Sequence, residues 1–496
     1  MAWVDPDTHG WVHHPKNDAD WSALVDQCGG GPRFELVLKV ARRNRCKTVV
    51  VENRYIDADF RSDYSAFWSK RFDSLSPFTR RIHFFKAHIE DDHLHDLSAK
   101  HGYLGYSVVK AGPHDDGRIG RTMLLPPPQL RNATMALVED EVSVFGNRLT
   151  IRAAPYSEQD GEFLRCAHSA IWACHYSAYR RGLVGRRLTA ELAELAPALL
   201  SAARSLPSPG MTLEQIQAVF DATGQPALLY GINQLPEVRG VEDPPQKIDP
   251  TDPAKKRILP AGLWDTRLFS VICRYLNSGF PVLIANARHA WVLVGWFKRA
   301  GQIRFVACDD QQGPYEVVQS PFTDKRKPWL AIMVPLPPKV FMSGEMAENW
   351  GHRTFRAFGQ VAGVPPSWAA LSQALASLPK GVSLRTFLRD GRDYKAGLAL
   401  QGRPDEVVRQ LRLARLPHYV WVVEAHDRAL RDARKPSVLA EVVFDPNSSD
   451  HPQREPRRDA LTMPGATFIS PPDDGKTVAV RYAEQAWSSH LRPRPK

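Results

Sequence analysis

The chain has 496 residues, which is more than one hydrophobic core organises, so we expect several domains. Its net charge of +11 comes from arginine-rich patches spread along the chain. Without a recognisable nucleic-acid fold or an aromatic and basic stripe, that charge does not predict a specific nucleic-acid partner. The most apolar stretch, residues 280–297, is interrupted by Pro281, Asn286, Arg288 and His289, so we expect no membrane-spanning helix.

Cysteine usage predicts a reducing compartment. The six cysteines are scattered and form no CxxC pair, and the N-terminus lacks the basic segment, apolar run and cleavage site of a secretory signal. We therefore expect a cytoplasmic protein, with export by another route left open. These cysteines are Cys28, Cys46, Cys166, Cys174, Cys273 and Cys308.

Proline clusters divide the chain into three predicted domains, because consecutive prolines suit neither helix interiors nor central strands. The clusters Leu124–Leu130 and Val334–Val340 place the boundaries near 150 and 338, giving domains 1–150, 151–337 and 338–496. The first domain mixes β-prone runs with a helical stretch at residues 57–72, which indicates a small α+β domain.

Four carboxylates in the first domain raise a metal-site hypothesis. Basic residues lie beside them, so we favour a solvated acidic face and predict no metal here. The four are Glu52, Asp57, Asp59 and Asp63.

The middle domain runs from helices to strands. A strand at 147–156 precedes a long helix at 165–182 and a second helical pattern at 189–204. A third helix opens at Thr212, which has capping-box spacing to Gln215, and stops at Gly224.

A proline- and charge-rich loop at residues 232–263 then suggests a lid or a substrate-contacting insertion. Strands follow at 279–287, 289–310 with a hairpin turn at "RAGQ", and 327–336. Helices followed by antiparallel strands predict an α+β fold.

The last domain, 338–496, contains several helical stretches, strand candidates at 418–426 and 438–445, and a polar tail from Pro446 onward. Its pattern indicates no function.

Cys166 is the strongest candidate for chemistry. At 100° per residue it shares one narrow helix face with Ala170, Ala173 and Ser177, so another layer can approach closely. It lies in the first turn, where free N–H groups and the helix dipole stabilise a thiolate. A small buried core thiol is the alternative.

A zinc site on the same helix is not predicted. His168 and His175 share a face opposite Cys166, and Cys174 points in a third direction, so one helix cannot bring these groups around a tetrahedral ion.

A base and an orienting acid follow later in the chain. His289 opens the strand "RHAWVLVGW", and "FVACDDQQGPY" ends the neighbouring strand in Asp309 and Asp310. A thiolate nucleophile needs a base, and the base needs an acceptor that orients it. The pattern therefore predicts a triad of Cys, His and Asp in that order.

These segments resemble the papain-like cysteine peptidases, above all the compact bacterial forms that include bacteriocin-leader-processing peptidases. Residues 158–173, 210–226, 288–296 and 309–315 resemble the Cys block, a later helix, the His strand and the block of the third residue. The family's Asp or Asn, three residues before a Gly, corresponds to Asp310, with Asp309 as the runner-up. The resemblance covers about residues 155–335.

The resemblance implies a papain-like α+β fold and hydrolysis of protein or peptide amides without a cofactor. Cys166 would attack the carbonyl, His289 would carry the proton, Asp310 would hold the imidazole, and Gln159 would form the oxyanion hole with the Cys166 N–H. Three departures stand out: Ala167 replaces the usual Gly, Arg288 stands where Gly is frequent, and Gln159 lies one residue further from the Cys than in papain.

Other readings of the same residues remain open. A thiol deamidase or acyltransferase uses the same triad, and an inactive papain-like scaffold would bind a protein or nucleic acid. The additional domains suit a regulated effector or defence protease, by analogy alone.

Overall fold

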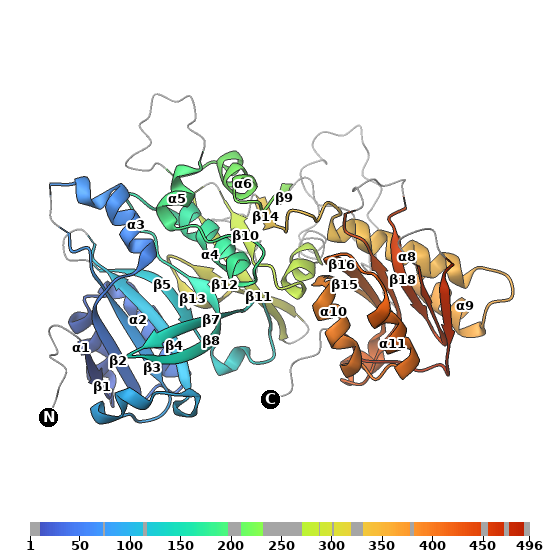
Figure 1. The fold of residues 1–496 in the computed structure, drawn as a ribbon, viewed down its shortest axis with the longest axis horizontal. Coiled ribbons are helices and arrows are strands. Elements are labelled where there is room, and N and C mark those ends of the chain that lie inside the picture. The colour runs from blue at the N-terminus through green and yellow to red at the C-terminus, as the bar shows by residue number, and fades with distance from the viewer. Residues whose placement is uncertain are drawn as a thin grey trace. The chain divides into compact units, whose positions relative to one another are not determined.

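The computed structural model describes most of the chain, and Figure 1 traces it from the N-terminus in blue to the C-terminus in red. The described residues are 10–72, 75–112, 117–196, 210–231, 270–286, 288–299, 302–318, 331–376, 381–447, 455–470 and 476–490. The predicted lid at 232–263 lies outside them, as do the end of the second helical pattern and the turn residues 300–301.

The chain forms two compact units rather than three. Unit 1 comprises Met1–Ile232 and Gly279–Pro337, and unit 2 comprises Asn233–Ser278 and Pro338–Lys496. The expected division near 150 is thus internal to unit 1, because the N-terminal sheet and the following helices share one hydrophobic core. The chain passes from unit 1 to unit 2 for the last time at Pro337 and Pro338, within the proline cluster.

The first sheet of unit 1 has the strand order β1-β2-β3-β4-β5-β8-β7, and all its pairs are antiparallel. Alternating burial along β7, as in Val138, Asp140 and Val142, produces one buried face. The strands are β1 (Gly10–His13), β2 (Thr48–Tyr55), β3 (Thr79–Phe85), β4 (Tyr103–Lys110), β5 (Arg118–Leu124), β7 (Val138–Val144) and β8 (Asn147–Tyr156); the accompanying helices are α1 (Asp18–Cys28), α2 (Gly31–Arg43) and α3 (Ala58–Ala66).

The second sheet of unit 1 has the order β13-β12-β11-β10-β14-β9, and the short β6 pairs with β11. Gly295 permits that pairing, because a Cβ there would lie 2.2 Å from the Met135 sulfur. The strands are β6 (Thr134–Met135), β9 (Ala227–Gly231), β10 (Val282–Ala285), β11 (Ala290–Arg299), β12 (Gln302–Asp309), β13 (Gly313–Val318) and β14 (Ala331–Pro335).

Helix α4 (Cys166–Arg180) packs against β8 of the first sheet and β11 of the second. Its small residues Ala170 and Ala173 are buried, as the narrow apolar face predicts. Helices α5 (Thr189–Glu194) and α6 (Leu213–Ala222) pack on α4. The expected capping box of Thr212 and Gln215 begins α6.

Unit 2 is built on the antiparallel sheet β15-β16-β17-β18-β19-β20. Val420 and Val422 of β16 pack in a core with α10 and α11, whereas the alternate residue Val423 lies beside Gly351 of α8. Helices therefore cover both faces, as Figure 1 shows, which explains the continuous apolar run of β16.

The strands of this sheet are β15 (Val382–Asp390), β16 (Tyr419–Asp427), β17 (Val438–Phe444), β18 (Arg458–Met463), β19 (Ala466–Ile469) and β20 (Val478–Arg481). The helices of unit 2 are α8 (Gly344–Gly359), α9 (Pro366–Ala376), α10 (Gly391–Gly397), α11 (Asp405–Leu413) and α12 (Arg428–Asp432), besides a helix at residues 270–277.

The expected polar tail after Pro446 is wrong, because β18, β19 and β20 belong to the sheet. Polar residues such as Asp459, Thr462 and Thr467 are buried in β18 and β19 beside Leu461 and Met463, so the sequence lacked a continuous apolar pattern here.

Mixed helices and antiparallel sheets agree with the predicted α+β class. In the described part of the chain, no helix combines the length and apolar character that crossing a bilayer requires.

Candidate active site

Cys166 is the first residue of α4, and the loop that precedes it is held in place by hydrogen bonds. Asp160 Oδ1 accepts hydrogen bonds from the backbone N–H groups of Glu162, Phe163 and Leu164, at 2.8–2.9 Å. Most of the α4 side chains are buried, but Cys166 remains partly exposed. Cys166 lines a small cavity, and as a first-turn residue it has a backbone N–H without an intrahelical acceptor.

His289 is held by a tight turn immediately before β11. The Asn286 side chain accepts the backbone N–H groups of Arg288 and His289, both at 2.8 Å, and the Asn286 N–H donates to the carbonyl of His289 at 2.9 Å. The imidazole is thereby placed at the beginning of a rigid strand, as predicted from the sequence.

Asp309 makes the direct contact with the imidazole. It ends β12, which pairs with β11, and its Oδ1 lies 2.9 Å from His289 Nε2. The Gln311 backbone N–H donates to the same oxygen at 2.8 Å, and the Gln311 side-chain nitrogen lies 3.3 Å from His289 Nδ1.

A hydrogen bond with Cys166 is one of the interactions that determine the pKa of His289. Burial lowers the pKa of His289, but hydrogen bonds with Asp309 and Cys166, together with the charges of Asp309 and Asp310, raise that pKa to about 10. Burial acts to raise the pKa of Asp309, and the hydrogen bond and charge of His289 outweigh it, so that pKa is lowered. At neutral pH the pair is therefore an imidazolium and a carboxylate.

Asp310 behaves differently from its neighbour. Its Oδ1 lies 3.5 Å from His289 Nε2, and neither of its carboxylate oxygens has a hydrogen-bond partner among the described residues. The side chain is buried, and burial raises the pKa of Asp310 to about 7.

The geometry thus favours the runner-up, Asp309, over Asp310 as the residue that orients the imidazole. The register of β12 shifts between Ala307 and Asp309 at a bulge. A bulge changes which side chains face the neighbouring strand, so spacing to Gly313 does not identify the contacting carboxylate.

Gln159 is not brought to the thiol in the same way. It is half-buried in the loop after β8, and it is not among the residues that line the small cavity beside Cys166. The oxyanion role that the resemblance implies for Gln159 stays a prediction, and the Cys166 backbone N–H is the other donor expected there. That cavity is lined by Pro155, Tyr156, Ser157, Cys166, Ser169, Ala170, Ala173, Ala290, Trp291, Val292, Cys308 and Asp310.

Sequence reasoning missed Arg33, which reaches the site from α2. Its Nη1 donates to the backbone carbonyl of Asp310, and its Nε lies 3.3 Å from Glu158. On the same helix, Leu36 lies against Gly313, where an added Cβ would be 2.9 Å from the Leu36 Cβ. No sequence signal connects α2 to residue 310, because the contact spans most of unit 1.

The four carboxylates of the first domain do not form the expected solvated acidic face, because Asp57, Asp59 and Asp63 are buried and all four have internal partners. Glu52 pairs with Arg81 at 2.5 Å and with His83 at 2.9 Å. Asp63 accepts a hydrogen bond from the Thr189 hydroxyl.

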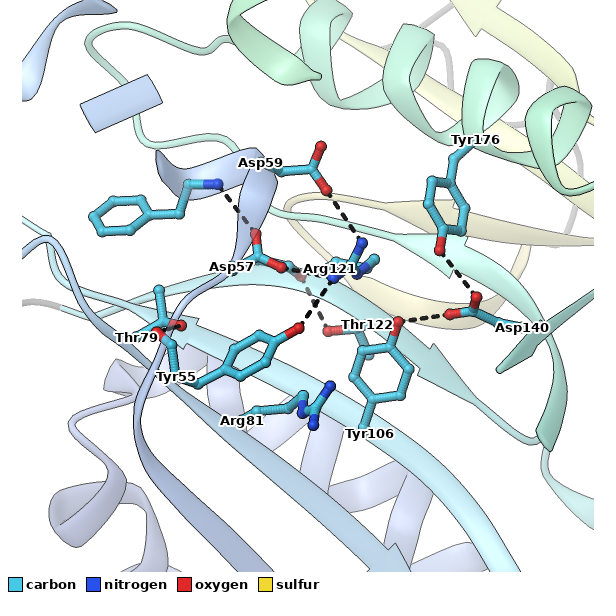
Figure 2. Close-up of polar contacts among 12 residues, drawn as sticks. Tyr55, Asp57, Asp59, Thr79, Arg81, Tyr106, Arg121, Thr122, Asp140 and Tyr176 are labelled. Atoms are coloured by element: carbon cyan, nitrogen blue, oxygen red, sulfur yellow. Dashed lines mark hydrogen bonds and ion pairs between the residues drawn. The ribbon is translucent and has the colours of Figure 1, made fainter. Parts of the chain in front are cut away.

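Asp57 and Asp59 flank Arg121, as Figure 2 shows, with ion-pair distances of 2.8 Å and 3.6 Å. The guanidinium also lies over the rings of Tyr106 and Tyr176, whose hydroxyls both donate to Asp140. The network joins the first sheet to α4, so its role is to position the helix that begins with Cys166.

The histidines of α4 also have internal partners. The Arg165 backbone N–H donates to His168 Nδ1 at 3.1 Å, and the Gln225 side-chain nitrogen lies 2.7 Å from His175 Nδ1. Burial is the largest cause that lowers the pKa of each ring to about 4, so both are neutral. Cys174 is fully buried.

His289, Asp309 and Asp310 could themselves hold a divalent cation, because their ligand atoms all lie within 4.8 Å of one another. The same atoms also suit acyl transfer, since a thiol adjoins the imidazole. No protein-family model matches this chain, and neither a curated protein nor a solved structure does. The chemistry therefore rests on the geometry of the site.

Proposed function

We propose that this protein is a cysteine peptidase that hydrolyses protein or peptide amide bonds. The observation that carries the proposal is the meeting of three side chains from three elements: Cys166 at the start of α4, His289 before β11 and Asp309 at the end of β12. A helix that begins with the thiol and packs on an antiparallel sheet bearing the other two is the papain-like arrangement that the resemblance implies.

In the proposed acylation step, Cys166 acts as a thiolate and His289 as an imidazolium. The Cys166 thiolate attacks the carbonyl carbon of the substrate, and the amide π electrons move to oxygen. The Cys166 backbone N–H donates to this oxyanion, a contribution worth about 3 kcal/mol. The His289 imidazolium then gives its proton to the leaving nitrogen as the C–N bond breaks, which leaves a thioester.

Deacylation reverses the roles of the imidazole. Neutral His289 takes a proton from water while the water oxygen attacks the thioester carbonyl, and the carboxylic acid departs as the thiolate re-forms. Asp309 accepts the Nε2 hydrogen throughout, so Nδ1 is the ring nitrogen that exchanges the proton, and the Gln311 side-chain nitrogen, 3.3 Å from Nδ1, would give way to the leaving nitrogen and the water.

All six cysteines are free, which suits a protein of a reducing compartment such as the cytoplasm, where a nucleophilic thiol stays reduced. Unit 2 lies outside the segment that resembles a peptidase, and we assign it no step of the reaction.

The first test measures alkylation of Cys166 by iodoacetamide against pH, read by peptide mass spectrometry in wild type and in His289→Ala. We expect wild-type Cys166 to be alkylated readily at pH 6, because the adjoining imidazole assists the sulfur as a nucleophile. In His289→Ala the alkylation rate at pH 6 should fall toward that of Cys273.

Cys273, which is also partly exposed, serves as the internal reference, and His93→Ala is the matched control on an exposed histidine. Identical profiles in wild type and His289→Ala, or an unreactive Cys166, would refute the peptidase. A binding scaffold would then be the better hypothesis. If the pair is present, cleavage of a denatured-protein substrate mixture, absent in Cys166→Ala, distinguishes hydrolysis from deamidation or transfer.

A further inference from the structure

A second cluster of ligand-type side chains lies in unit 1, at the end of the first sheet. His14 follows β1, whereas His88 and Glu90 follow β3, and Thr48 of β2 lies between these strands. One ligand atom from each of His14, His88 and Glu90 lies within 4.8 Å of the other two. This group shares no residue with the site around Cys166.

Thr48 fixes the tautomer of His14. The Thr48 hydroxyl donates its proton to the carbonyl of Ala87 at 2.8 Å and accepts the backbone N–H of Ile89 at 3.1 Å. Its contact with His14 Nδ1, at 3.3 Å, therefore has Nδ1–H as the donor. The lone pair of His14 is then on Nε2, the tautomer that a metal-binding imidazole with a hydrogen-bonded Nδ1–H needs.

The imidazole rings of His14 and His88 and the carboxylate of Glu90 lie close together. The ring centroids of His14 and His88 lie 3.9 Å apart, and His88 Nε2 lies 2.8 Å from Glu90 Oε1. Neighbouring ligand atoms of a tetrahedral zinc ion, with bonds near ~2.1 Å, are about 3.4 Å apart, and the ligand atoms of this group all lie within 4.8 Å of one another. The side chains of His88 and Glu90 are 54% and 62% exposed, so they can rotate to complete the geometry.

The charges around the cluster favour a cation. His14 lies beside the ring of His88 at this end of the sheet. The carboxylates of Glu90 and Asp91 act on the same ring and supply negative charge.

We propose that His14, His88 and Glu90 form a binding site for a divalent transition-metal ion, with Zn²⁺ as the best match. Two imidazole nitrogens and one carboxylate oxygen are a donor set that Zn²⁺ accepts, and water completes the coordination. The ion ties the loop after β1 to the loop after β3 across β2. The expected consequence is stabilisation of the N-terminal edge of unit 1 when zinc is bound.

The test is a zinc titration of the chelator-treated full-length protein by isothermal calorimetry. Variants separate this site from the His289 cluster: His14→Ala and His88→Ala remove ligands, Asp309→Asn alters the other cluster, and His93→Ala is the control on an exposed histidine nearby. We expect one equivalent of Zn²⁺ whose affinity falls at least ~tenfold in the two ligand variants and is unchanged in Asp309→Asn and His93→Ala.

Glu90→Gln guards against loss of folding, because its exposed side chain makes no core contact. It should weaken binding in the same direction while the circular dichroism spectrum stays that of wild type. Zinc binding that is absent in wild type, or that survives in all three ligand variants, would overturn the site. Alkylation of Cys166 should be unaffected by the three ligand variants, His14→Ala, His88→Ala and Glu90→Gln. The test of the zinc site is therefore independent of the proposed peptidase.

Discussion

At the residue scale, two adjacent carboxylates respond in opposite ways to one imidazole. Asp309 shares a hydrogen bond and opposite charge with His289, which outweigh the effect of burial and lower its pKa. Asp310 is buried without a hydrogen-bonded partner for its side chain among the described residues, and burial raises its pKa to about 7. Direct hydrogen bonding, rather than proximity alone, distinguishes the orienting acid from its neighbour.

Asp309→Asn should therefore impair Cys166 more than Asp310→Asn. We expect the rate of iodoacetamide alkylation at pH 6 to fall at least ~tenfold in Asp309→Asn, because the imidazolium loses its main partner. The change in Asp310→Asn should be smaller than ~threefold. Equal losses in the two variants would contradict this assignment.

The raised pKa values of His289 and Asp310 predict a pH dependence of folding stability. The pKa of His289 is raised to about 10, so its stabilising effect is complete below about 6.5 and is lost as the pH rises through about 10. The pKa of Asp310 is also raised, so the folded state holds that proton more tightly, and stability falls as the pH rises from about 4 to about 7. Urea unfolding should show Asp310→Asn gaining stability over wild type at pH 8 relative to pH 5.

At the scale of elements, helix α2 contacts and holds the turn between β12 and β13. Arg33 binds the carbonyl of Asp310 and the carboxylate of Glu158, and Leu36 fills the space that Gly313 leaves. Gly313 has φ +96°, a conformation that disfavours a side chain, so the turn depends on this glycine. The N-terminal sheet therefore supports the candidate active site instead of forming a separate domain.

Arg33→Ala should shift the pH profile of Cys166 alkylation, because the turn that carries Asp309 loses its anchor. Arg33→Lys should restore part of the wild-type profile, since an ammonium group can still bind one of the two oxygens. Lys39→Ala, an exposed position on the same helix, is the matched control and should match wild type. A profile that Arg33→Ala leaves unchanged would show that α2 has only a packing role.

At the scale of the whole molecule, each compact unit has its own buried core and its own buried ion pairs. In unit 2, Arg274 lies 3.0 Å from Glu345 and 2.6 Å from Glu348, with all three side chains buried. Arg274 belongs to the helix at residues 270–277, which precedes β10 of unit 1 in the chain. The chain thus returns to unit 1 after contributing this helix to unit 2.

Arg274→Met should destabilise unit 2 alone, by about 3–5 kcal/mol, because two buried carboxylates lose their cation. Hydrogen exchange read by mass spectrometry should show lost protection in β15, β16 and β17 and unchanged protection in β10, β11 and β12. The control Arg409→Met breaks an exposed pair with Glu406 and should leave stability and protection in both units at wild-type levels. Loss of protection in both units would mean that they unfold together.

The sequence by itself determined most of the local elements of this protein. The period of apolar residues placed β2, β8, α4 and β16, and the capping box placed the start of α6. These signals are readable because each depends on residues within one turn or one strand. The candidates Cys166 and His289 were found for the same reason: each begins an element with a strong local pattern.

Only the tertiary structure decided how distant residues meet. It placed Asp309, at a bulge, closer to His289 than Asp310, brought Arg33 to the turn of β12, and brought His14 beside His88 and Thr48. It also turned the expected polar tail into three strands and merged the first two predicted domains. These outcomes depend on strand register and on contacts between segments far apart in the chain, whose energies no local pattern of residues contains.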